Sequence, residues 1–120
     1  MSENVLGKYD LSELLKHYED AARSHEAAIK NGAPRQADKC TLRAQHVFEE
    51  LVRRGKRDVL LVFLDHPTPI VALFAAAEVI KFAPSAAIPV LEKLAKDEVG
   101  IASLDAEALL DLYQHEGGHN

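Results

Sequence analysis

The apolar residues of this chain repeat at an offset of 31 residues. Large apolar side chains alternate with alanine in the same order three times over. The positions in register are Leu42, Leu73 and Leu104, then Ala44, Ala75 and Ala106, then Phe48, Val79 and Leu110. A period in this range is typical of stacked helix pairs, because one pair alone is too small to bury its apolar face. The repetition therefore predicts an all-α chain of three stacked antiparallel helix pairs.

Capping and breaking residues predict where the helices begin and end. Asp10 followed by Glu13 is a capping-box pattern, and Asn31-Gly32 suits a left-handed helix end. Pro34 suits the first turn of a helix, and Ser85 is expected to cap a later one. The predicted helices span about residues 11–30, 34–54, 57–65, 69–82, 86–96 and 102–114.

The run from Val59 to Leu64 is apolar throughout, so periodicity cannot separate a buried strand from a short buried helix. We predict a helix, because Thr68 can cap and Pro69 can start another helix soon after it. That next helix is apolar nearly all round, with only Glu78 and Lys81 charged. It is therefore predicted to be the central and most buried element.

Length and composition predict one domain over residues 1–120. With 48% apolar residues, the chain can bury a core without disulfides or metal. Cys40 is the only cysteine, so nothing indicates an oxidising compartment. The first residues lack the pattern of a secretory signal, and the apolar runs fall short of the roughly 20 residues that cross a bilayer. We expect a cytoplasmic protein without membrane contact.

Charge is distributed unevenly along the chain. The net charge of −5 argues against a nucleic-acid partner, because duplex binding depends on neutralising phosphates. Residues 31–57 carry seven basic and three acidic side chains, whereas 97–120 carry six acidic side chains and no Lys or Arg. Oppositely charged ends steer partners. The dense run Arg53-Arg54-Gly55-Lys56-Arg57 is interpreted as a solvated turn at the negative end of a helix, with phosphate or acidic-protein binding as the alternative.

Sequence motifs in the second half resemble a known repeat. They are Leu64-Asp65-His66-Pro67, the run from Val71 to Ala76, and Phe82-Ala83-Pro84-Ser85-Ala86-Ala87-Ile88-Pro89. A short helix, an Asp/Pro turn and an alanine-rich second helix resemble HEAT-type repeats. The whole chain is similar to a small bacterial family named domain of unknown function 2019. The resemblance covers residues 58–113 best, and it implies a short right-handed array of the HEAT/armadillo kind with no assigned activity.

The histidines and the single cysteine are the candidates for chemistry. The sequence His115-Glu116-Gly117-Gly118-His119 matches the two-histidine zinc pattern of metalloproteases, but its glycines oppose the regular helix that the pattern needs. We expect that His115 and His119 do not share a metal. His25 is predicted to bond a neighbouring backbone group, and Cys40 to lie in the core. No catalytic residue, metal or cofactor is predicted, and the chain is not expected to be an enzyme.

Phe74 interrupts the charge pattern of the repeats. Glu78 and Lys81 mark the face of their helix that meets water, and Phe74 lies one turn before Glu78 on that face. The equivalent positions in the other repeats are charged, Arg43 and Asp105. An aromatic side chain ringed by polar residues is typical of protein-binding hot spots. The hypothesis is that Phe74 anchors a partner; the alternative is that Phe74 belongs to the core.

We therefore predict a non-enzymatic protein–protein interaction module in which the second helix of each pair lines the binding surface. The candidate binding residues are Arg43, His46, Arg53, Phe74, Glu78, Lys81 and Asp105. The partner is expected to be a protein or peptide, and a weak homodimer through the helix at 69–82 is a further expectation. Three alternatives stay open: a small acidic protein that neutralises a toxin or nuclease, an enzyme or metal protein using the histidines, and a nucleic-acid binder using the basic turn.

Overall fold

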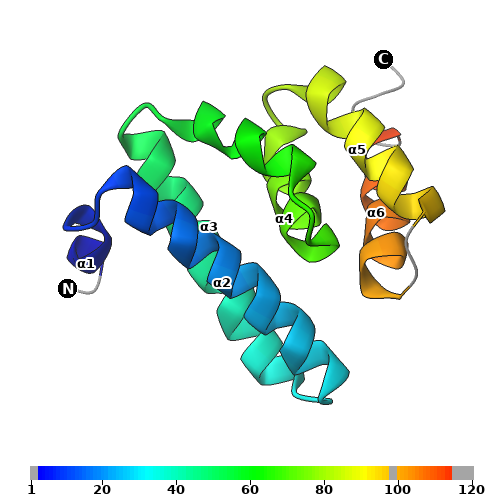
Figure 1. Ribbon diagram of the computed structural model, residues 1–120, viewed down its shortest axis with the longest axis horizontal. Coiled ribbons are helices and arrows are strands. Elements are labelled where there is room, and N and C mark those ends of the chain that lie inside the picture. The colour runs from blue at the N-terminus through cyan, green and yellow to red at the C-terminus, as the bar shows by residue number, and fades with distance from the viewer. Residues whose placement is uncertain (1–2, 98–99, 115–120) are drawn as a thin grey trace. The chain divides into compact units, whose positions relative to one another are not determined.

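The structure, a computed structural model, describes residues 3–97 and 100–114. Within those ranges every regular element is helical and no strand occurs, which confirms the all-α class (Figure 1). The helices are α1 (Glu3–Gly7), α2 (Leu11–Lys30), α3 (Pro34–Arg53), the 3-10 helix η1 (Arg57–Asp65), α4 (Pro69–Val79), α5 (Pro84–Asp97) and α6 (Ile101–Tyr113). Length predicts one domain, whereas internal contacts group the chain into two compact units, Met1–Arg57 and Asp58–Asn120.

None of the helices in the described ranges combines the length and the apolar character that a membrane crossing requires.

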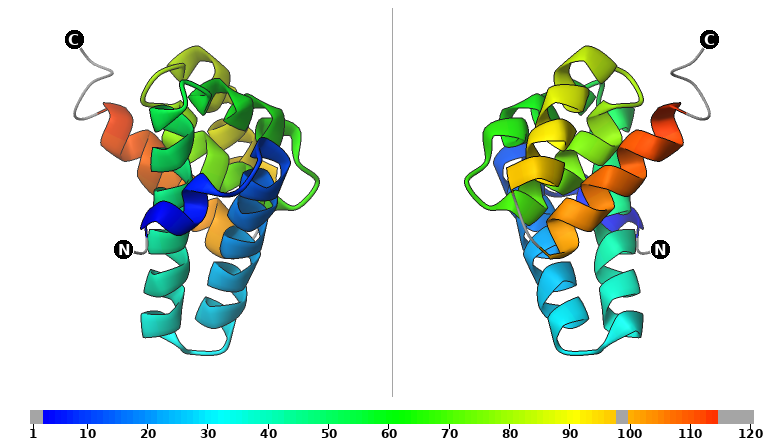
Figure 2. Two further views of the ribbon diagram at one scale, coloured as in Figure 1. Left: turned by 90° about the vertical axis from the view of Figure 1, so that its left-hand side faces the viewer. Right: turned by 90° about the vertical axis from the view of Figure 1, so that its right-hand side faces the viewer.

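The antiparallel pair of α2 and α3 forms the body of the first unit (Figure 2). α2 begins at the predicted capping box: the backbone N–H of Glu13 donates to Asp10 Oδ1 at 2.8 Å, and that of Asp10 donates to Glu13 Oε1 at 2.9 Å. Two of the free amides at the start of the helix are thereby satisfied. Pro34 occupies the first turn of α3, as predicted. The short helix α1, which the sequence did not predict, packs against α3.

Both long helices end in the same kind of turn. Gly32 and Gly55 each have a φ of +70°, and the amide that follows each glycine donates across the last turn at 2.8 Å. A Cβ is disfavoured in this left-handed conformation, so glycine is the residue that allows such an ending. The predicted helix end at Asn31-Gly32 is confirmed.

Small side chains let α2 and α3 pack closely. Buried in this pair are Leu14, Tyr18, Ala21, Ala22, Ala28, Ala37, Cys40, Ala44, Val47, Glu50 and Leu51. The predicted core position of Cys40 is confirmed. His25 Nδ1 lies 3.1 Å from the carbonyl oxygen of Ala37 and 3.0 Å from Thr41 Oγ1, so this histidine ties α2 to α3. That contact confirms the predicted bond to a neighbouring backbone group.

The segment from Arg57 to Asp65 is the 3-10 helix η1, neither a strand nor an α-helix. A 3-10 helix has three residues per turn, so residues three apart lie on one side. Leu60 and Phe63 have this spacing and are buried, while Val62 is 67% exposed. The helical prediction for this segment is confirmed, and the two buried side chains lie on one side of the 3-10 helix.

Helices α4, α5 and α6 pack on one another in the second unit. α4 is the most buried of them, as its composition predicts. Its buried residues are Ile70, Val71, Ala72, Leu73, Ala75, Ala76 and Val79.

Several boundaries in the second unit differ from the prediction. α4 ends at Val79, not residue 82, and the chain turns before α5 begins at Pro84. Ser85 therefore lies inside α5 and does not cap it. Thr68 is the N-cap residue of α4, but its side chain makes no capping hydrogen bond. Instead its backbone N–H donates to His66 Nδ1 at 2.9 Å, so the imidazole satisfies a polar group of the turn.

Candidate protein-binding site

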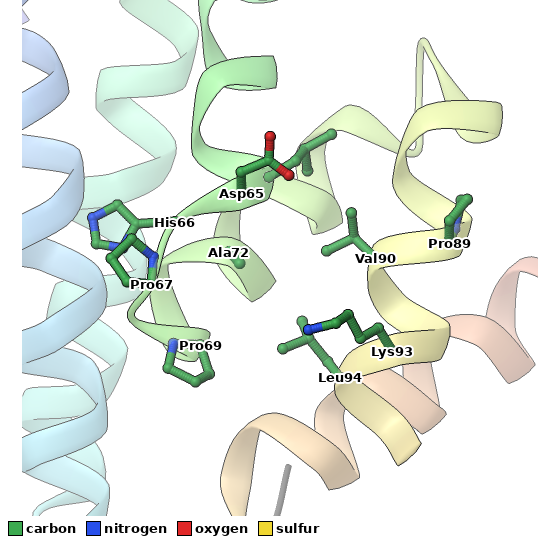
Figure 3. Close-up of a pocket in the computed structure, with 10 residues that line it drawn as sticks. Asp65, His66, Pro67, Pro69, Ala72, Pro89, Val90, Lys93 and Leu94 are labelled. Atoms are coloured by element: carbon green, nitrogen blue, oxygen red, sulfur yellow. The ribbon is translucent and has the colours of Figure 1, made fainter. Parts of the chain in front are cut away.

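A groove of about 440 Å³ lies in the second unit between the turn after η1 and helix α5 (Figure 3). Its volume falls within the roughly 300–1,000 Å³ that is usual for ligand sites. The lining residues are Leu64, Asp65, His66, Pro67, Pro69, Ala72, Pro89, Val90, Lys93 and Leu94. Ala72 contributes only a methyl group from α4, so the space between the turn after η1 and helix α5 stays open.

The first wall is a turn whose backbone is held in place. Pro67 and Pro69 fix their own φ angles. Two hydrogen bonds add to this: the Thr68 N–H donates to His66 Nδ1, and the His66 N–H donates to the carbonyl of Phe63 at 3.0 Å. The ring of His66 also meets that of Phe63 edge-on, with centroids 5.6 Å apart. His66 thus acts as a structural residue of the turn, and Asp65 is the exposed charged group of this wall.

The second wall is one face of α5. Val90 and Leu94 are one turn apart and supply apolar surface, with Pro89 and Lys93 beside them in the same spacing. Pro89 has no N–H to donate within the helix. Lys93 Nζ lies 3.9 Å from Asp97 Oδ2, but the Lys93 side chain is 77% exposed. An ion pair as exposed as this contributes little, so Lys93 can turn toward a ligand.

The groove therefore combines apolar side chains with polar surface, including a carboxylate on one wall and an ammonium group on the other, as Figure 3 shows for Asp65 and Lys93. Such a surface suits an extended peptide, whose side chains can fill the apolar part while charged or backbone groups bond to the rims.

The seven residues predicted to bind a partner are divided between the two units. Arg43, His46 and Arg53 belong to the first, and the other four belong to the second. Arg43, His46, Lys81 and Asp105 are exposed, while Phe74 and Glu78 are half-buried. Glu78 is bonded to the turn that follows α4, since Lys81, which lies beyond the end of that helix, donates from its Nζ to Glu78 Oε1 at 3.0 Å.

Arg53 is engaged by Glu50, a carboxylate that is only 7% exposed. Glu50 accepts hydrogen bonds from Arg53 Nε at 3.0 Å and from Arg54 Nε at 2.7 Å, and Arg53 Nη2 also bonds to it. These hydrogen bonds, that from Arg53 first and that from Arg54 second, hold the pKa of Glu50 below its ordinary value.

Arg54 joins the start of the chain to the end of α3. Its Nη2 donates to the carbonyl oxygens of Leu6 at 3.1 Å, Gly7 at 3.4 Å and Tyr9 at 2.8 Å. The same side chain bonds to Glu50. The interpretation of residues 53–57 as a merely solvated turn is therefore wrong for Arg54, which is a structural residue. No sequence signal pointed to this bond, because its partners are backbone atoms more than forty positions away.

Phe74→Ala tests the hypothesis of an aromatic anchor. Because Phe74 is half-buried, we expect the change to lower the free energy of unfolding by about 2 kcal/mol, less than the roughly 3–5 kcal/mol of a fully buried phenylalanine. Urea unfolding followed by circular dichroism measures this loss, with the exposed Lys81→Ala as control. A loss as large as that of a core residue would show that Phe74 is core and would end its candidacy as an anchor.

Within residues 3–97 and 100–114 there is no cluster of three or more His, Cys, Asp or Glu side chains that could hold a metal ion. The motif from His115 to His119 lies outside the described residues, so the expectation for it stays a prediction.

The groove was not among the predicted sites, although Asp65, His66 and Pro67 belong to the repeat motif of the second half. A usable signal was present in α5, where Val90, Leu94, Pro89 and Lys93 recur at four-residue spacing. What the sequence could not supply was the pairing of that face with the turn.

One solved structure is similar to this chain over nearly its whole length. It is the crystal structure of the protein RPA1889 from Rhodopseudomonas palustris CGA009, with a TM-score of 0.84 and 20% identity, covering 93% of this chain and 94% of that one. No family model and no curated protein matches the sequence. At this identity the likeness concerns the fold.

Proposed function

We propose that this chain is a non-enzymatic protein-interaction module that holds an extended segment of a partner protein in the groove of the second unit. The observation that carries the proposal is the groove itself, in which apolar side chains lie between the charged groups of Asp65 and Lys93. A turn fixed by prolines loses little conformational entropy on binding, which favours affinity for a peptide.

The proposal includes the architecture and setting that the sequence suggests. The 31-residue repetition supports a short HEAT-like array, and the motif around Asp65 and Pro67 supports membership of the bacterial domain of unknown function 2019 family. A cytoplasmic location and a protein partner in preference to nucleic acid belong to the same proposal, on the grounds of cysteine content and net charge.

The groups in the groove support binding over catalysis. Asp65 and Lys93 are exposed to water, and His66 already accepts the Thr68 amide. General acid–base catalysis depends on groups held in place within reach of a substrate, whereas the carboxylate of Asp65 and the ammonium group of Lys93 are exposed. These two groups beside apolar side chains suit the recognition of a ligand of mixed charge.

A random-peptide library displayed on phage tests the proposal. Peptides selected on the intact chain should bind with an affinity measurable by calorimetry, and adding them to ¹⁵N-labelled protein should shift the amide signals of the turn at 64–69 and of α5. Lys93→Glu should weaken binding by about tenfold, which corresponds to the loss of one charge-assisted hydrogen bond of about 1.4 kcal/mol.

Lys96→Glu is the matched control, because Lys96 is an exposed lysine on the same helix that does not line the groove. It makes the same change in net charge and should leave the affinity nearly unaltered. Equal weakening by both variants, or signal shifts confined to other surfaces, would contradict the proposal.

A further inference from the structure

Helix α6 carries apolar side chains on two opposite faces. Its inner face, with the buried Ala102 and Ala106, packs on α4 and α5. Its outer face carries Leu104, Ala108 and Leu112, one turn apart from each other. Leu104 is 67% exposed and Leu112 is 53% exposed. A helix that is apolar on both sides is normally covered on both sides.

The repeat register gives a second reason to expect a cover. Leu104 lies at the same repeat position as Leu73 of α4, and Leu73 is only 3% exposed. α6 therefore carries at this position a leucine whose counterpart in α4 is buried, and leaves it open to solvent.

Carboxylates border the apolar stripe on both sides. At 100° per residue, Asp105 falls beside one edge of the stripe, and Asp111 and Glu107 fall beside the other. All three are exposed. Residues 97–120 carry six acidic side chains and no Lys or Arg, so the sequence around the stripe is acidic. A second α6 docked on this stripe would bring carboxylates against carboxylates, whereas a helix with basic flanks would meet opposite charge.

We infer that the outer face of α6 is a docking surface for a basic amphipathic helix of a partner protein. The apolar face of that helix covers Leu104 and Leu112. Its Lys or Arg residues face Asp105, Glu107 and Asp111. This surface is separate from the groove, since none of its residues lines the groove, and neither assignment depends on the other.

A synthetic peptide provides the probe. It is a fluorescein-labelled helix of about 18 residues, or five turns, built from Leu and Lys with leucines at helical spacing. Its binding to the intact chain is followed by fluorescence anisotropy at two salt concentrations. Leu104→Lys should weaken binding by about tenfold or more, as expected for a central apolar contact, and added salt should weaken binding to the unaltered chain.

Val62→Lys is the matched control, because Val62 is as exposed as Leu104, at 67%, and the substitution makes the same change in net charge. It should alter the affinity less than about twofold, a change smaller than the tenfold effect of one hot-spot residue. Equal weakening by both variants would show a general charge effect and would overturn the inference, as would binding of a peptide with Glu in place of Lys. Sedimentation of the chain alone as a dimer that Leu104→Lys dissociates would overturn it too, because a second copy would then be the cover.

Discussion

Leu73→Ala is expected to lower the free energy of unfolding by about 3 kcal/mol. Leu73 is 3% exposed at the centre of α4, the most buried helix of the second unit. Removing its side chain loses the transfer free energy of three carbons and leaves a cavity that packed neighbours fill only in part. Urea unfolding monitored by circular dichroism gives the loss directly.

Leu104→Ala makes the same chemical change at the equivalent position of the next repeat and serves as its control. Because Leu104 is 67% exposed, we expect a change within about 0.5 kcal/mol of zero. The difference between the two losses in free energy of unfolding shows how differently two equivalent positions of the sequence repeat are buried. Equal losses of unfolding free energy would mean that Leu104 is covered in the isolated chain. This result would contradict the exposed outer face of α6.

Arg54→Met is expected to destabilise the chain by about 2 kcal/mol, because hydrogen bonds to charged groups contribute roughly 1.5–3 kcal/mol. The variant keeps most of the apolar stem of Arg54 but removes its bonds to Glu50 and to the carbonyls of Leu6, Gly7 and Tyr9. The nearby Arg53→Met should cost much less, since that side chain is 67% exposed. A larger loss from Arg53→Met than from Arg54→Met would contradict the structural role of Arg54.

The same cluster predicts a pH dependence. The folded-state pKa of Glu50 is lowered, chiefly by its hydrogen bonds to Arg53 and Arg54, so its contribution to stability is present above the unfolded pKa of about 4.3 and is lost as the pH falls through the folded pKa. Glu50→Gln should therefore be less stable than the unaltered chain at neutral pH. The difference in free energy of unfolding between the two should become smaller as the pH falls, and this difference is the gap to be measured. Unfolding titrations from neutral pH to about pH 3, below the ordinary glutamate pKa, give the comparison; a gap independent of pH would exclude the ionised pair as the cause.

The two proposed surfaces would serve an interaction module in different ways. The groove, between a proline-fixed turn and α5, offers a small rigid site for an extended segment. The outer face of α6 offers an apolar stripe between carboxylates for a helix. The alternative of a protein that neutralises a basic toxin would use the second surface, and the predicted homodimer through α4 would have little exposed apolar surface to use.

The sequence by itself determined the features that depend on neighbours along the chain. The capping box at Asp10 and Glu13, the glycine turn after Asn31 and the proline starts of α3 and α4 are local, because each bond joins residues a few positions apart. Helical periodicity likewise revealed the buried faces of α2 and α3, and the scarcity of charge in α4, where only Glu78 is charged, revealed its burial.

Only the tertiary structure decided the features that depend on what packs against each residue. Leu73 and Leu104 share a place in the repeat, yet one is buried and the other exposed, because burial depends on a neighbouring helix and not on the residue itself. Arg54 stabilises the fold because it donates hydrogen bonds to carbonyls that are distant in sequence. The groove lies where the turn after η1 is close to one face of α5. Local pattern specifies which face of a helix is apolar; the partner of that face is set by the packing of elements far apart in the chain.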